Sequence, residues 1–213
     1  MTGVDPDSTH TSRMRLLEAG KILFARLGYE QTSTATIAKE AGTSESQLVR
    51  YFKGKAGLLE AIFNSGWTYL NGEIQRVVVA APDAREALAS VLHCVSEAFG
   101  KDPDLAYLLL FEGRRIRGAG SEILLSKGFL DFENLIRVLI HRGKRDGTFR
   151  PVASDDAIAS ALLGATEAMI RDRLMAQRSG KASPYSDEEI GSVFLAMIGG
   201  LGQGMGSDAS PTS

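Results

Sequence analysis

The stretch Gly28–Leu59, GYEQTSTATIAKEAGTSESQLVRYFKGKAGLL, decides how the N-terminal part of the chain folds. It contains two short helical patterns, Thr34 to Glu40 and Glu45 to Phe52, separated by Ala41-Gly42-Thr43. Isolated helices of about two turns are marginal in water, so both need neighbouring helices to pack against. A short glycine-containing turn between two such helices is typical of a helix-turn-helix. The stretch therefore predicts a helix-turn-helix that reads DNA.

Small polar residues and glycine mark the ends of these helices. Ser33 is predicted to cap the first helix, because a serine side chain at this position accepts a bond from a backbone N–H. The sequence Ser44-Glu45-Ser46-Gln47 predicts a capping box, in which the Gln47 side chain reaches back to the cap of the second helix. Gly28 is placed to adopt the left-handed conformation that ends the preceding helix.

The composition is that of an ordinary soluble domain. Of the 213 residues, 44% are apolar and 23% are charged, and the net charge is -2. Many nucleic-acid-binding modules are strongly basic, and here basic charge is only local: Ser44 to Gly57 holds three basic residues against one acidic residue. The single Cys94 excludes an intrachain disulfide and a thiolate metal cluster within one chain.

The N-terminal residues do not form a targeting segment. Residues 1–10 have neither a basic start nor an apolar run, so they do not read as a signal peptide. No stretch reaches about 18 uninterrupted apolar residues, the length needed to span a membrane. We therefore expect a cytoplasmic protein with no membrane partner.

Helical periodicity continues along the whole chain, and no alternating strand pattern occurs. The expected fold is all-α with about nine helices, beginning near residues 12, 34, 45, 55, 83, 103, 121, 155 and 186. The helix that starts near Lys55 is long enough to join an N-terminal three-helix bundle, residues 11–55, to a C-terminal helical domain, residues 56–201. Residues 1–10 and 202–213 are expected to be flexible tails.

A set of residues spread over the first 60 positions matches the pattern of one known family. They are Arg13, Leu16-Leu17, Ala19, Leu23-Phe24, Gly28-Tyr29-Glu30, Thr32, Ile37-Ala38, Ala41-Gly42, Ser44, Leu48, Tyr51-Phe52, Lys55 and Leu58-Leu59. In these residues the chain resembles the TetR family of one-component transcriptional repressors. The resemblance implies a homodimer in which three N-terminal helices bind DNA and the C-terminal helices form a ligand-binding and dimerisation domain.

The resemblance also implies roles for single residues. Thr34 and Thr43 match positions that contact phosphate, and Lys55 matches a lysine that touches the DNA backbone. Positions that face the major groove or its walls are matched by Ser46, Gln47, Arg50 and Tyr51. Val49 stands where the family usually has tyrosine and can still touch a thymine methyl. The full set of expected DNA-binding residues is Thr34, Thr43, Ser44, Ser46, Gln47, Val49, Arg50, Tyr51 and Lys55.

Elementary chemistry supports the same roles. Helix N-termini bind phosphate through free N–H groups, Arg50 can donate a bidentate pair to guanine, and Gln47 suits adenine. In a dimer the two reading helices should lie about 34–36 Å apart and match a palindromic operator. The alternatives are that Gln47 only caps its helix, that Arg50 and Lys55 are solvated surface charges, and that Tyr51 packs beneath the helix.

Two stripes of small residues recur at every fourth position in the last two expected helices. Such stripes let helix backbones approach closely, so we expect a dimer interface built from two helices of each subunit. The alternative is packing of the two helices on each other within one chain. The stripes consist of Ser160, Gly164 and Ala168 in one helix and Ser192, Ala196 and Gly200 in the other.

A ligand pocket is expected among the helices between residues 55 and 178, with apolar and aromatic walls. The alternative for most of these side chains is ordinary core packing. The candidate lining residues are Trp67, Leu109, Phe111, Phe129, Phe132 and Met169.

Motifs of enzymes are not found. There is no H-E-x-x-H, no G-x-x-x-x-G-K-[ST] and no G-x-S-x-G, so we expect no catalytic activity, no metal and no cofactor. The sequence predicts a ligand-responsive transcriptional regulator, a repressor released from its operator by a small molecule. The alternative is a helical small-molecule-binding protein that has lost DNA binding, which Val49 and the acidic net charge keep open.

Overall fold

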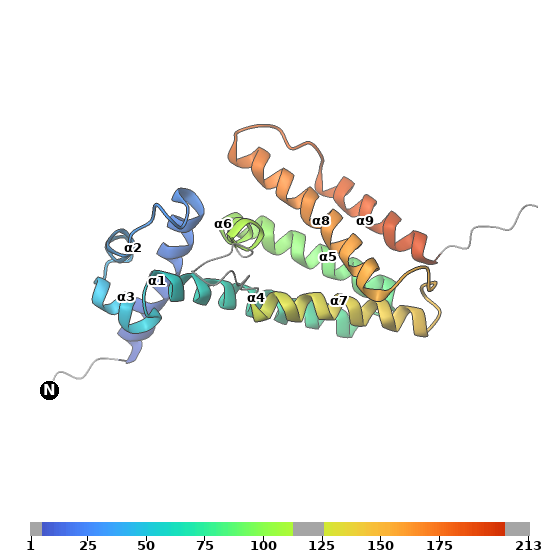
Figure 1. The fold of residues 1–213 in the computed structure, drawn as a ribbon, viewed down its shortest axis with the longest axis horizontal. Coiled ribbons are helices and arrows are strands. Elements are labelled where there is room, and N and C mark those ends of the chain that lie inside the picture. Colours follow the sequence, from blue (N-terminus) through green and yellow to red (C-terminus); the bar gives the residue numbers. More distant parts are fainter. Residues whose placement is uncertain (1–5, 113–125, 203–213) are drawn as a thin grey trace, which may run out of the picture. The chain divides into compact units, whose positions relative to one another are not determined.

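The computed structural model describes residues 6–112 and 126–202, and these residues form helices and connecting turns without any strand (Figure 1). The all-α prediction is therefore confirmed. The helices are α1 (Pro6–Leu27), α2 (Thr34–Glu40), α3 (Glu45–Phe52), α4 (Lys55–Ala80), α5 (Ala84–Lys101), α6 (Pro103–Tyr107), the π-helix η1 (Leu108–Glu112), α7 (Lys127–Arg145), α8 (Asp155–Arg178) and α9 (Asp187–Gly202).

The chain ends differ from the predicted tails. Helix α1 begins at Pro6, so the prediction of a flexible tail is wrong for residues 6–10; proline is favoured at the first helical position, where its missing N–H is not needed. Gly202 closes α9, so it is not part of a tail. Residues 1–5 and 203–213, and the predicted helix start at Ser121, lie outside the described residues.

The chain divides into two compact units that each draw on separate parts of the sequence. Residues up to 73 and residues 97–132 form the first unit, and residues 74–96 together with those from 133 onward form the second. Helix α6 and the π-helix η1 belong with the helix-turn-helix because both pack against α1. The functional boundary predicted after residue 55 stays a prediction, and the compact unit that holds the helix-turn-helix extends beyond it.

The core of the first unit explains how two-turn helices remain folded. Helices α2 and α3 bury their inward apolar side chains against α1, α4 and η1. Each such side chain contributes roughly 1.5–3 kcal/mol when fully buried, which the isolated helices lack. The buried core residues include Leu16, Phe24, Ile37, Leu48, Phe52, Leu58, Leu59, Ile62 and Leu108.

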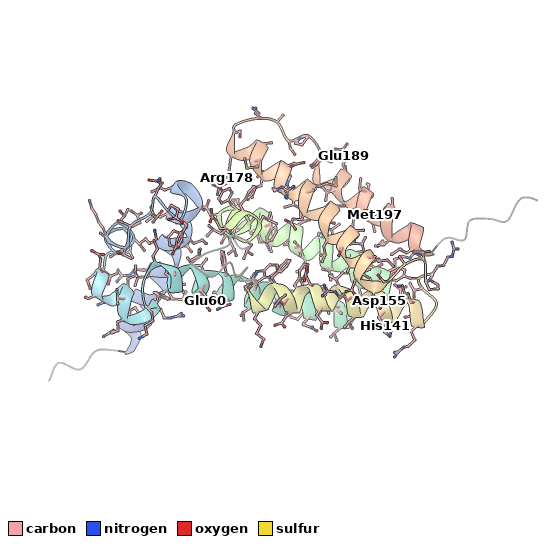
Figure 2. All side chains as sticks on the ribbon, viewed as in Figure 1. Glu60, His141, Asp155, Arg178, Glu189 and Met197 are labelled. Atoms are coloured by element: carbon pink, nitrogen blue, oxygen red, sulfur yellow. The ribbon has the colours of Figure 1, made fainter. Side chains whose placement is uncertain are left out.

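In the second unit, α7 and α8 are joined by charged contacts as well as by apolar packing. Lys144 Nζ donates to Asp155 Oδ1 at 2.6 Å, and His141 Nδ1 lies 3.1 Å from Asp155 Oδ2. Figure 2 labels His141 and Asp155. Gly143 allows the closest approach in this region, because a Cβ there would lie 2.2 Å from the Phe149 ring. The apolar core of this unit includes Leu88, Val91, Ile140, Phe149, Ile158, Leu162, Ile170, Leu174, Ile190, Phe194 and Ile198.

No helix in the described ranges combines the length and the apolar character that a membrane crossing requires.

Candidate nucleic-acid interface

Hydroxyl caps start both helices of the helix-turn-helix, as predicted. Ser33 Oγ accepts from the Thr36 N–H at 3.0 Å, and Ser44 Oγ accepts from the Gln47 N–H at 3.4 Å. Between the helices Gly42 has a φ of 59°, in the left-handed region that glycine adopts without strain. These caps and this glycine fix the turn between α2 and α3.

The second half of the predicted capping box does not form. The Gln47 side chain was expected to bond the backbone of the cap, but its Oε1 instead accepts from Thr43 Oγ1 at 2.6 Å. The Thr43 hydroxyl, one residue before the cap, is therefore the donor to Gln47 in place of the cap N–H. The bond links two residues that were expected to contact DNA and holds both at the start of α3.

One face of α3 is buried and the opposite face is open. Leu48 and Phe52 point into the core of the first unit, whereas Ser46, Val49 and Arg50 are exposed. Val49 has 52% of its surface accessible, which leaves it available to a thymine methyl. The exposed residues of α3 therefore coincide with residues expected to face the major groove.

Arg50 and Tyr51 are engaged with each other on this face. An Arg50 guanidinium N–H donates to Tyr51 Oη at 2.8 Å, and its Cζ lies 4.8 Å from the centre of the Tyr51 ring. The Tyr51 ring also packs edge-on against Phe52, with ring centres 6.2 Å apart. Tyr51 thus packs against the core, as the alternative reading held, while its hydroxyl holds the Arg50 side chain.

An acidic residue that the sequence reasoning did not single out lies between the starts of α2 and α3. Thr34 Oγ1 donates to Glu45 Oε2 at 2.6 Å, so one expected phosphate-contacting hydroxyl already has a carboxylate partner. Both side chains belong to first turns, where helix dipoles favour negative charge. A DNA phosphate approaching Thr34 has to replace this carboxylate.

Lys55 makes contacts within the chain and is not an ordinary solvated surface lysine. Its Nζ donates to the Tyr29 carbonyl oxygen at 2.9 Å and lies 4.4 Å from the centre of the Tyr29 ring. The ammonium group has three donors, so these contacts leave it able to reach a backbone phosphate as well. Lys55 ties the start of α4 to the loop that follows α1.

The turn from α3 to α4 requires unusual backbone. Lys53 has a left-handed φ of 62° and Gly54 a φ of 115°. Gly57 lies so close to the end of α3 that a Cβ there would be 1.8 Å from the Phe52 carbonyl oxygen. This contact sets α4 at a fixed position against α3.

Of the expected pocket residues, three come together in the first unit. The Trp67 ring centre lies 5.5 Å from that of Phe129 and 5.4 Å from that of Phe132. Phe111 stacks instead on Tyr107, at 4.7 Å, and Leu109 is buried in η1. Met169 is half-buried and belongs to the second unit.

The small-residue stripes of α8 and α9 face away from their own protomer. Ser160, Gly164, Ser192, Ala196 and Gly200 are exposed, and Ala168 is half-buried. A Cβ at Gly164 or at Gly200 would meet no side chain and no other segment of the chain within 4 Å. The exposed members of the stripes therefore leave room for a second helix, and the dimer interface stays a prediction.

The N-terminal part of the chain matches one protein-family model. Residues 16–62 match the model described as "Bacterial regulatory proteins, tetR family". Among curated proteins, the nucleoid occlusion factor SlmA of Vibrio campbellii is 27% identical over 162 residues, which cover 73% of this chain and 80% of that protein. The fatty acid metabolism regulator protein of Bacillus subtilis is 26% identical over 141 residues, covering 64% of this chain and 70% of that protein.

Solved structures share the fold over most of the chain. The fatty acid degradation regulator FadR from Bacillus halodurans superimposes with a TM-score of 0.76 at 22% identity, covering 88% of this chain and 98% of that one. The regulator FadR from Bacillus subtilis, solved in complex with stearoyl-CoA, has a TM-score of 0.76 at 18% identity and covers 90% and 98% of the two chains. Both are described as regulators.

Proposed function

The chain belongs to the TetR family of bacterial regulatory proteins, and we propose that it is a ligand-responsive transcriptional repressor that a small molecule releases from its operator. The observation that carries this proposal is the open face of α3, on which Ser46, Val49 and Arg50 are exposed while Leu48 and Phe52 anchor the helix from behind. A capped, anchored helix with a polar outer face is what insertion into a major groove requires.

Each residue of this surface has a proposed contact. Arg50 leaves Tyr51 to donate two hydrogen bonds to a guanine, and Gln47 pairs with an adenine. Ser46 and Val49 contact neighbouring base edges. The other expected DNA-binding residues contact backbone phosphates, and these contacts fix the register of the protein on the DNA without reading its sequence. These phosphate-contacting residues are Thr34, Thr43, Ser44, Tyr51 and Lys55.

We propose that α8 and α9 of two protomers form the dimer interface. Their small-residue stripes are exposed, and α9 adds Val193 and Leu195, with 43% and 52% of their surfaces accessible. Apolar exposure of this kind beside small residues favours close packing of helices from a second copy. A two-fold dimer presents two copies of α3 and therefore matches a palindromic operator.

Release by a small molecule follows from linkage between two sites. A ligand bound among α4, α6 and α7 that favours one arrangement of these helices changes DNA affinity by the same factor by which DNA changes ligand affinity. The first unit supports such coupling, because α6 and η1 pack on α1 and α4 follows α3 directly. Bacillus subtilis FadR, which shares this fold, was solved in complex with stearoyl-CoA.

The alternative, a helical binding protein without DNA affinity, is not favoured. Val49 departs from the family's tyrosine, but the helix caps, the glycine turn and the exposed Arg50 all support DNA binding. No catalytic activity is proposed.

Selection from a random DNA pool tests the proposal directly. The purified full-length protein should enrich a palindromic sequence, and fluorescence anisotropy should show tighter binding to that sequence than to a scrambled one. Affinity should fall steeply as salt rises, because phosphate contacts release counterions. Failure to enrich any sequence at low salt would reject the proposed function.

A further inference from the structure

One buried polar atom in the first unit has no explained role. The Asn71 side chain donates from Nδ2 to the Gly128 carbonyl oxygen at 2.9 Å, linking α4 to the first turn of α7. Its other end, Oδ1, is buried and accepts no hydrogen bond; among residues 11–112 and 126–201 no other buried side-chain nitrogen or oxygen is in this position. The Nδ2 bond fixes the amide, because a half-turn would break this bond and place Oδ1 against the Gly128 carbonyl oxygen, which is also an acceptor.

Aromatic rings surround this part of α4. Trp67 precedes Asn71 by one helical turn, on the same side of the helix, and its ring contacts Phe129 and Phe132 at 5.5 and 5.4 Å. Gly128 lets α7 approach so closely that a Cβ there would lie 2.2 Å from Trp67 Cβ. Asn71 therefore places a lone acceptor beside a cluster of three rings, which we name the Trp67 cluster.

A buried acceptor without a partner destabilises the protein unless something returns a hydrogen bond to it. Native proteins leave few such atoms, and an ordered water, an ion or a ligand is one way in which their bonding is completed. An apolar wall with one convergent polar atom is also the usual composition of a small-molecule site.

We propose that Asn71 Oδ1 and the Trp67 cluster form an effector site that selects apolar molecules carrying a neutral hydrogen-bond donor, a hydroxyl or an amide N–H. The donor bonds Asn71 Oδ1, and the apolar body packs against Trp67 and Phe129. This inference rests on the proposed ligand-responsive function and names the chemical class of the ligand.

We expect the hydrogen-bond donor of the ligand to be neutral, because Asn71 and the rings of the Trp67 cluster carry no charge. An amide oxygen carries no net charge, so it does not offset the cost of removing an ionised group from water. The rings of Trp67, Phe129 and Phe132 offer no further hydrogen-bonding oxygen. A hydroxyl or amide N–H loses little on transfer to such a site once it is bonded to Oδ1.

Trp67 is the only tryptophan of the chain, so its fluorescence reports directly on this site. Two isomers, 1-octanol and methyl heptyl ether, make a matched pair of probes, because they share size and apolar area and differ in the hydroxyl donor. Each is titrated into the full-length protein while Trp67 emission is followed. The measured quantity is the ratio of the two dissociation constants, ether over alcohol.

We expect this ratio to be about three- to tenfold larger in the wild type than in Asn71→Leu, which replaces the acceptor by an apolar group of similar size. Comparing ratios between variants cancels the different hydration of the two probes. Asn71→Ala, which adds no bulk, should give the same loss and serves if the leucine variant does not fold. Asn64→Leu, an exposed position on α4, should leave the ratio unchanged.

Equal ratios in the wild type and in both Asn71 variants would overturn the assignment, as would unchanged Trp67 emission with both probes up to their solubility limits. The same protein samples are assayed for binding to the selected DNA. Intact DNA binding with equal ratios rejects the effector site alone, and absent DNA binding with a lowered ratio in the variants rejects the repressor function alone.

Discussion

Lys21 of α1 donates a 2.6 Å hydrogen bond to Asp102 Oδ2, while Asp102 Oδ1 accepts from the Leu105 N–H at 2.9 Å and so caps α6. Burial of the Lys21 ammonium lowers its pKa, but hydrogen bonds to Asp102 and Glu18 outweigh that effect and leave the pKa above its ordinary value of 10.5. One carboxylate thus serves two helices. It starts α6 and fastens that start to the first helix of the DNA-binding bundle.

Separate substitutions can distinguish the helix-capping role of Asp102 from its ion pair with Lys21. Asp102→Asn keeps a capping side chain and loses the ion pair, whereas Asp102→Ala loses both, so the alanine variant should be less stable than the asparagine variant by about 1 kcal/mol. Lys21→Met should destabilise the wild type and have a smaller effect in the Asp102→Asn background. Urea unfolding measures the stability of the wild type, the three single variants and the double variant. Strict additivity would show that the ion pair contributes nothing.

Arg50 should read one base of the operator. Arg50→Ala is expected to weaken binding by about 1–3 kcal/mol and to relax specificity at a single base pair, because a bidentate contact to guanine is lost. Anisotropy against a set of single-base operator variants measures both effects. Arg178→Ala, which removes the same charge from α8 in the second unit, is the matched control (Figure 2). Equal specificity profiles for both variants would exclude Arg50 from base reading.

The approach of α4 to α3 should tolerate no side chain at Gly57. Gly57→Ala places Cβ 1.8 Å from the Phe52 carbonyl oxygen, so the α3–α4 turn has to open, at a cost of about 2–3 kcal/mol in the free energy of unfolding. Gly72 lies on the same helix with nothing within 4 Å of its Cβ position. Gly72→Ala should therefore stabilise the protein by about 0.5–1 kcal/mol. Thermal unfolding distinguishes the two, and opposite signs are the expected result.

Local features of the fold could be predicted from the sequence, and contacts between distant side chains could not. The caps at Ser33 and Ser44 follow from short-range rules, and the structure contains both. Ser186 and Glu189 cap each other at the start of α9 by the same short-range chemistry, with hydrogen bonds of 2.8 and 3.1 Å. Helix α1 was predicted to start too late because its first turn is polar and has no apolar periodicity to detect.

The pairings between side chains could not be predicted in the same way. Thr34 meets Glu45, and Lys55 meets Tyr29, because the turns bring these residues together in space, and their separations of 11 and 26 residues carry no periodic signal. The unpaired Asn71 oxygen is likewise a property of packing. Sequence patterns predict which residues form the proposed interface, and three-dimensional packing decides which of their atoms already have a partner within the chain.

The contact between α7 and α8 should weaken in acid. The hydrogen bond from Lys144, and then that from His141, lower the pKa of Asp155 below its ordinary value of 3.8. A depressed pKa stabilises the fold above the unfolded-state value, and this stabilisation is lost as the pH falls through the folded-state value. The difference in melting temperature between wild type and Asp155→Asn should therefore hold from pH 7 to pH 5 and shrink below about pH 4.

Asp131→Asn, an exposed carboxylate on α7, controls for the general loss of negative charge. Its melting temperature should follow that of the wild type at every pH. A difference for Asp155→Asn that persists unchanged into acid would mean that its charge does not stabilise this contact.

Dimer formation should depend on the small residues of α9. Ala196→Arg buries an unpaired charge at the proposed interface, which costs about 3 kcal/mol or more and raises the dimer dissociation constant about a hundredfold. Operator affinity should fall with it, since both copies of α3 are needed. Ala182→Arg, in the exposed loop between α8 and α9, makes the same substitution outside the interface. Sedimentation velocity over a concentration series should find Ala196→Arg monomeric and Ala182→Arg dimeric.

The hydrogen bonds of Thr34 to Glu45, of Thr43 to Gln47 and of Arg50 to Tyr51 have a kinetic consequence. Each bond engages, within the protein, a donor or acceptor that could otherwise bond to DNA of any sequence. The Glu45 carboxylate also repels the phosphates nearest to it. Only a sequence that supplies replacement partners compensates for opening these bonds. The protein should therefore dissociate quickly from nonspecific DNA and search a genome rapidly. Its residence time should be long only on the operator.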